Sequence, residues 1–209
     1  MKIISIINQK GGVGKTTTVI NLASALSQLG KKILVIDLDP QGNATTGLGL
    51  SNTSQSDQTI YGILNGTMSI SNVIKKTNFQ NLDLISSNVD LSGLEVETAG
   101  DSDRAFILKS KLTPYLNDSR GLYDYILIDC PPSLSLLTVM ALVSSNSLLV
   151  PLQTEFFALE GLTQLMKTIE RIKINLNPLL EIQGILLTMY DRRNKLSSQV
   201  NKKREIFKD

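Results

Sequence analysis

A cluster of glycines between two lysines lies near the N-terminus, in the run Lys10-Gly11-Gly12-Val13-Gly14-Lys15-Thr16-Thr17. Glycine has no Cβ, so its backbone can curl tightly and direct successive N–H groups at one anion. A helix that begins near Lys15 would add its positive end. We therefore predict that residues 10–17 bind ATP: Lys15 supplies a charge for the β- and γ-phosphates, and the Thr16 hydroxyl is a ligand for Mg²⁺.

This loop departs from the standard phosphate-binding pattern G-x-x-x-x-G-K-[ST]. Counted back from Gly14, the first glycine of the pattern falls on Gln9, and a second lysine, Lys10, precedes the glycine pair. The alternative is a glycine-rich turn that carries two surface lysines. The apolar run before the loop and the amphipathic segment after it both favour the nucleotide site.

Two further segments place aspartates after apolar runs. Asp37-Leu38-Asp39-Pro40 follows residues 33–36, and Asp129-Cys130-Pro131-Pro132 follows residues 126–128. A carboxylate at the end of a buried strand suits Mg²⁺, usually through a water molecule. We expect Asp129 and Asp39 to serve the metal, and Asp39 also to orient the water that attacks the γ-phosphate. The alternative is that these aspartates cap helices.

The elements that must position these residues alternate along the chain. Short apolar runs predict strands at residues 3–7, 33–36, 82–85, 125–128, 148–152 and 182–187. Helical periodicity predicts helices ending near residue 29 and at residues 60–64, 103–116, 159–174 and 196–208. Residues 40–66 are rich in Gly, Asn, Ser and Thr and predict a long loop that holds the short helix.

This alternation predicts one α/β domain over residues 1–209. Its sheet is doubly wound and mostly parallel, of the P-loop NTPase type, with helices on both faces. Ligands of such sheets bind at the carboxyl ends of the strands. The turns after residues 7, 36 and 128 lie at that edge, so the loop and both aspartate segments should meet there.

The composition excludes several kinds of site. The chain has 209 residues, 42% of them hydrophobic and 19% charged, with no histidine and one cysteine. Histidine-based catalysis and histidine-ligated metal are therefore absent. A single Cys130 cannot form an intrachain disulfide or by itself hold an iron–sulfur cluster. No signal peptide or membrane-length apolar run is seen, so we expect a cytoplasmic protein.

Positive charge gathers at the C-terminal end. Residues 191–209 contain seven basic and three acidic residues, a net charge of +4 in a chain whose total is +2. Basic side chains gain affinity for DNA by releasing counterions from its phosphates, without reading the bases. The alternative is an ordinary solvated helix face.

Four spaced segments resemble the ParA/Soj chromosome- and plasmid-partitioning ATPases, of the deviant-Walker-A class that also contains MinD. The resemblance runs nearly the whole length, and an Asp-Pro-Gln-Gly-Asn run favours ParA over MinD. The segments are residues 9–17, residues 37–43, Ile128-Asp129-Cys130-Pro131-Pro132-Ser133 and Glu155-Phe156-Phe157-Ala158-Leu159-Glu160-Gly161-Leu162.

The resemblance implies a function. Lys10 matches the family's extra lysine, which reaches the phosphates of the partner subunit's ATP in a nucleotide-sandwich dimer, while Asp39 matches the catalytic aspartate and Asp129 the Walker B aspartate. The ATP-bound dimer of such proteins binds DNA on the nucleoid without sequence preference. A ParB-type partner stimulates a slow ATPase and the dimer is released. The expected DNA contacts are Arg192, Arg193, Lys202, Lys203 and Arg204.

The family continues beyond the point where this sequence stops, so the resemblance also implies that its last strand and C-terminal helix are missing here. Glu155 and Glu160 are expected to position Lys10 or dimer contacts, or else to be ordinary helix-face charges. Two alternatives to the partitioning cycle stay open: a nucleotide-binding fragment with little ATPase activity, and a MinD-like protein that cycles on membranes. The second needs a basic amphipathic C-terminal helix.

Overall fold

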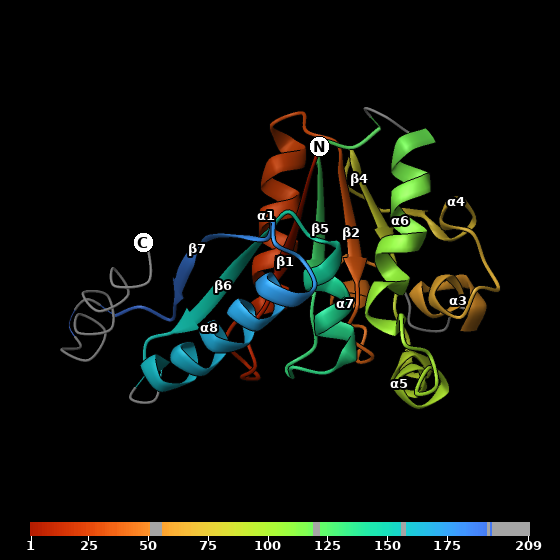
Figure 1. The fold of residues 1–209 in the computed structure, drawn as a ribbon. Helices are drawn as coiled ribbons and strands as arrows, with labels where there is room; N and C mark the ends of the chain where they lie inside the picture. Colours follow the sequence, from red (N-terminus) through yellow and green to blue (C-terminus); the bar gives the residue numbers. More distant parts are fainter. Residues whose placement is uncertain (51–55, 119–121, 156–157, 192, 194–209) are drawn as a thin grey trace.

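The computed structural model describes residues 1–50, 56–118, 122–155, 158–191 and 193 (Figure 1). Within them, one sheet has the strand order β3-β4-β2-β5-β1-β6-β7. Every neighbouring pair is parallel except β3 and β4. The strands are β1 (Lys2–Ile6), β2 (Ile33–Asp37), β3 (Lys75–Lys76), β4 (Leu82–Ile85), β5 (Tyr125–Asp129), β6 (Ser147–Gln153) and β7 (Glu181–Thr188).

Helices cover both faces of this sheet (Figure 1). The α-helices are α1 (Lys15–Gln28), α2 (Asn43–Gly47), α3 (Ile60–Leu64), α4 (Ile70–Val73), α5 (Leu94–Glu97), α6 (Ile107–Asp118), α7 (Leu136–Ser144) and α8 (Ala158–Asn175). Short 3-10 helices lie at Ser56–Gln58, Val89–Gly93 and Arg104–Phe106.

Two apolar cores result from the alternation of side chains along the strands. On β1, Ile4 and Ile6 pack with Val19 and Ala23 of α1 on one face. On the same strand, Ile3 belongs to the other core, which contains the buried side chains of α6, α7 and α8. The central strands are thus buried on both faces, as a parallel sheet between two helical layers requires.

The fold class predicted from the sequence is confirmed, and the predicted strands lie within one or two residues of the observed ends. The sequence analysis overlooked four helices, α2, α4, α5 and α7, and the antiparallel strand β3. The residues 40–66 were predicted to form a loop around one short helix, whereas α2 begins directly after Gly42. The helix predicted at residues 196–208 lies outside the described residues.

In the part of the chain that the structure describes, no helix combines the length and the apolar character that a membrane crossing needs.

Candidate nucleotide site

Three adjacent strands bring the loop and the two aspartate segments to one edge of the sheet. β5 lies between β1 and β2. Its last residue, Asp129, is in register with Ile6 on one side and with Asp37 on the other. The backbone N–H of Leu38 donates to the Asp129 carbonyl across 2.9 Å, which extends the pairing past the end of β2. Parallel pairing therefore sets the spacing of the site.

The glycine-rich loop has the backbone that anion binding requires. Gly12 and Gly14 have φ angles of 73° and 91°, in the left-handed region that glycine adopts without strain. Gly14 is also the N-cap of α1, and no side chain caps this helix end or places an acidic group in its first turn. The free N–H groups and the helix dipole therefore make this end attractive to an anion.

Lys15 is the positive charge inside the site. Its side chain is buried, and its ammonium donates to the Lys10 carbonyl at 3.0 Å. Burial lowers the pKa of Lys15, while the negative charges of Asp129 and Asp39 act in the opposite direction. The ammonium thus lies near two carboxylates and is poorly hydrated. A phosphate that binds beside it would stabilise its charged form.

Asp129 lacks the partners that a buried carboxylate needs. Neither carboxylate oxygen has a hydrogen-bond partner among the described residues. Burial raises the pKa of Asp129 to about 7 and the charge of Asp37 adds to this, while the Thr16 hydroxyl and the charge of Lys15 oppose it. Two buried oxygens beside a threonine hydroxyl form a donor set that fits Mg²⁺. The residues present therefore fit the metal.

The two aspartates at the end of β2 have different environments. Asp37 accepts hydrogen bonds from the backbone N–H and the hydroxyl of Thr45, both at 2.7 Å, and from the Asp39 N–H at 3.2 Å. Burial raises the pKa of Asp37 to about 6, against the effect of these bonds. Asp39 is buried and accepts from the Gln41 N–H at 3.0 Å. Asp37 therefore anchors the loop that presents Asp39.

Lys10 points to a different neighbour. Its ammonium forms an ion pair with Glu155, in the segment between β6 and α8. Asn8 fixes the backbone here, because its amide donates to the Pro151 carbonyl at 2.7 Å and accepts from the Lys10 N–H at 3.0 Å. Lys10 therefore lies at the exposed edge of the loop. Glu160, the other glutamate singled out by the sequence, is an exposed residue in the first turn of α8.

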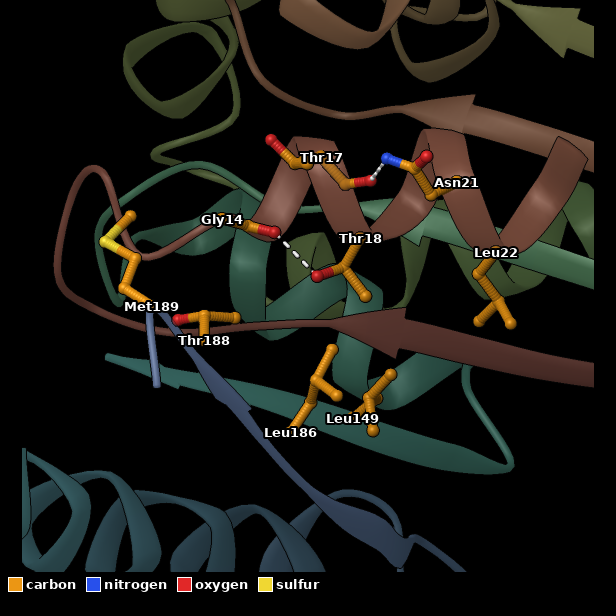
Figure 2. Close-up of a pocket in the computed structure, with 9 residues that line it drawn as sticks. All are labelled: Gly14, Thr17, Thr18, Asn21, Leu22, Leu149, Leu186, Thr188 and Met189. Carbon is orange, nitrogen blue, oxygen red and sulfur yellow. Dashed lines mark hydrogen bonds between the residues drawn. The ribbon is translucent and has the colours of Figure 1, made fainter. Parts of the chain in front are cut away.

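A cavity of about 600 Å³ adjoins the loop between α1 and strands β6 and β7 (Figure 2). Gly14 and Thr17 line its end nearest the loop, and Leu149 and Leu186 form its apolar floor. The cavity thus continues from the glycine-rich loop into an apolar space large enough for a nucleoside.

One of the five predicted DNA contacts, Arg193, lies within the described residues. Arg192, Lys202, Lys203 and Arg204 lie outside the described residues. Arg193 is described, and its guanidinium pairs with the Asp191 carboxylate at 2.9 Å. This pairing is exposed and offsets the charge of one arginine.

The pKa of Asp129 makes a prediction about stability without metal. In the folded chain Asp129 keeps its proton up to about pH 7, whereas an unfolded aspartate loses it near 3.8. The folded state binds more protons between these values, so the stability that Asp129 contributes falls as the pH rises. We expect Asp129→Asn, which cannot ionise, to gain up to about 4 kcal/mol in unfolding free energy relative to the wild type between pH 4 and 8.

The measurement is urea unfolding in EDTA at several pH values, with the exposed Asp103→Asn as the matched control. A difference between Asp129→Asn and the wild type that stays constant with pH would contradict the prediction. Added Mg²⁺ should reduce the difference, since it stabilises the ionised carboxylate.

Comparisons with known proteins agree with this geometry. A family model described as an AAA domain matches residues 1–182. The chromosome partitioning protein ParA of Caulobacter vibrioides is 52% identical over 202 residues, which cover 97% of this chain and 74% of that protein. The sporulation initiation inhibitor protein Soj of Bacillus subtilis is 46% identical over 209 residues, 100% of this chain and 81% of that protein.

Solved structures add nucleotide-bound relatives. A cobyrinic acid a,c-diamide synthase from Mycobacterium smegmatis with bound ADP and magnesium is 35% identical with a TM-score of 0.89, covering 97% of this chain and 80% of that chain. A putative plasmid partition protein from Borrelia burgdorferi bound to AMPPNP is 33% identical with a TM-score of 0.79, covering 98% and 80%.

Proposed function

Because the chain belongs to the ParA/Soj family of partitioning ATPases, we propose that it binds Mg-ATP at the loop of residues 10–17 and hydrolyses it slowly in an ATP-dependent dimer. The observation that carries the proposal is the buried Asp129 carboxylate, which accepts no hydrogen bond that meets the geometric criteria among the described residues and lies beside Thr16 and near Lys15. Such a carboxylate at a strand end beside a glycine-rich loop suits a metal-bound triphosphate.

Each residue would have a separate task. The N–H groups of the loop and the Lys15 ammonium bind the phosphates, and the cavity next to Gly14 receives the base and ribose. Thr16 and Asp129 would hold Mg²⁺, with Asp39 close by; when bound, the metal offsets the negative charge of the phosphates. Asp39 orients the attacking water and accepts its proton, a role that its burial near Lys15 supports.

Dimerisation would recruit Lys10. In the single chain its ammonium is paired with Glu155 at the exposed edge of the loop, so it is available to a second subunit at the cost of one surface ion pair. Surface ion pairs contribute only about 0.2–1 kcal/mol. A phosphate of the partner subunit's ATP, with more charge, could therefore replace Glu155 as the partner of Lys10.

The proposal predicts a mass that depends on nucleotide. Light scattering should give a dimer with Mg²⁺ and the non-hydrolysable analogue AMPPNP, and a monomer with Mg-ADP or no nucleotide. Lys10→Ala should remain a monomer with AMPPNP while its affinity for the analogue changes less than about tenfold. The matched control, exposed Lys109→Ala on α6, should dimerise like the wild type.

A wild-type monomer in every state, despite measured binding of AMPPNP, would contradict the dimer and leave a nucleotide-binding chain. If the dimer forms, binding to DNA of random sequence is the next expectation, with an affinity that falls steeply as salt rises. A ParB-type protein from the same genome should then accelerate hydrolysis and release the DNA. Arg192, Arg193, Lys202, Lys203 and Arg204 are the proposed contacts.

A further inference from the structure

Thr188, the last residue of β7, forms a hydrogen bond to the backbone of the glycine-rich loop. The Thr188 hydroxyl donates to the carbonyl of Val13 at 2.8 Å, across 175 residues of sequence. Val13 is 2% exposed, so its carbonyl has little access to water. Thr188 also lies close to the next residue of the loop: a Cβ added to Gly14 would be 3.5 Å from the Thr188 methyl group. Figure 2 shows Thr188 and Gly14 at the same end of the cavity.

This hydrogen bond fixes the direction of a neighbouring N–H group. The peptide between Val13 and Gly14 is trans, as no cis bond occurs in the described chain. In a trans peptide the C=O and the N–H point in opposite directions. A Val13 carbonyl held towards Thr188 therefore turns the Gly14 N–H away from Thr188 and β7. This N–H stands directly before Lys15, where a phosphate would bind.

The position of Thr188 is itself well defined. The Thr188 carbonyl accepts from the Thr154 N–H at 3.4 Å, and the Thr154 hydroxyl donates to the Met189 carbonyl at 3.3 Å. Met189 has a φ angle of 51°, a left-handed conformation that is uncommon for a residue with a side chain. A backbone held in this way is typical of segments whose neighbours over-determine it, often at functional sites.

We propose that Thr188 is a positioning residue for the nucleotide: its hydroxyl orients the Val13–Gly14 peptide so that the Gly14 N–H donates to a phosphate. This inference rests on the proposed nucleotide binding. It explains why a strand two positions away from β1 in the sheet takes part in the site. An oriented N–H loses no free energy to reorganisation when the phosphate arrives.

The test compares a substitution that removes the hydroxyl with one that keeps it. Thr188→Val removes the hydroxyl and keeps the branched shape, and Thr188→Ser keeps the hydroxyl. Titration calorimetry with Mg-ADP should show an affinity about 3- to 10-fold weaker for Thr188→Val, as expected for one lost hydrogen bond, and an affinity within about twofold of the wild type for Thr188→Ser. Hydrogen exchange of the Gly14 amide should be faster in Thr188→Val than in Thr188→Ser.

The outcomes separate this inference from the proposed function. If the wild type does not bind Mg-ADP, the proposed function fails, and the hydrogen-exchange comparison still tests whether the Thr188 hydroxyl orients the Val13–Gly14 peptide. If the wild type binds and Thr188→Val binds equally well, the inference is overturned. It is also overturned if Thr188→Ser loses as much affinity as Thr188→Val, because packing would then be the cause. Circular dichroism checks folding, and Thr188→Ala replaces Thr188→Val if the latter is unfolded.

Discussion

Replacing Lys15 with glutamine is expected to weaken the binding of Mg-ATP by at least about 100-fold, because two or more charge-assisted hydrogen bonds to the phosphates are lost. Lys15 is the buried cation of the site, and its ammonium lies near Asp129 and Asp39. Without it, a triphosphate would enter beside two carboxylates that no lysine offsets. Titration calorimetry with Mg-AMPPNP measures the loss directly.

The same substitution should leave the fold intact. Burial lowers the pKa of Lys15. The charged ammonium is therefore less stable in the folded nucleotide-free chain than in water. Removing that charge should leave the thermal unfolding temperature unchanged or slightly higher, the pattern expected where function is favoured over stability. The exposed Lys31→Ala is the matched control and should bind like the wild type. A Lys15→Gln chain that is folded and still binds Mg-AMPPNP normally would remove Lys15 from the proposed site.

The sequence could predict that the residues of the candidate site lie together, because they lie at strand ends. Continuous apolar runs followed by Asp129 or by Asp37 and Asp39 predict buried parallel strands, and parallel strands present their carboxyl ends at one edge. The order β2-β5-β1 then brings those ends together. The registers place Asp129 beside Asp37, a contact that follows from strand order and not from any local pattern.

The supporting contacts could not be found in this way. Asp37 is anchored by Thr45, eight residues along, and Val13 by Thr188, 175 residues along. A single threonine hydroxyl has no periodicity and no spacing rule that would mark its partner. The sequence shows an aspartate at position 37. Its role as the anchor of the Asp39 loop, however, depends on the path of the chain after β2 and could not be predicted.

α7 was missed for a different reason. Its residues are mostly apolar and nearly all are buried on every side, so no amphipathic stripe is present. Periodicity cannot distinguish such a helix from a buried strand. The Pro131-Pro132 pair predicted only the turn before it. β3 was missed because two lysines at a sheet edge carry no apolar signal, and its pairing with β4 depends on tertiary contacts.

Replacing Asp39 with asparagine is expected to lower the rate of ATP hydrolysis by about 100-fold or more, the usual contribution of a general base. Asparagine keeps the shape of the side chain and an oxygen that can accept the Gln41 N–H bond seen at 3.0 Å. It cannot accept a proton from water. The affinity for Mg-ATP should therefore stay within a few-fold of the wild type, because the phosphate contacts are unchanged.

Single-turnover hydrolysis with excess protein measures the chemical step, and light scattering of the same samples reports the assembly. Since ATP persists, Asp39→Asn should accumulate the dimer with ATP itself, where the wild type needs AMPPNP. Asp103→Asn, at an exposed position, controls for the loss of one negative charge. An unchanged rate in Asp39→Asn would assign the base to another group, and Asp37 would be the next candidate, since burial already raises its pKa to about 6. Its hydrogen bonds to Thr45 argue against that role, because they would have to break before the carboxylate could reach a water molecule.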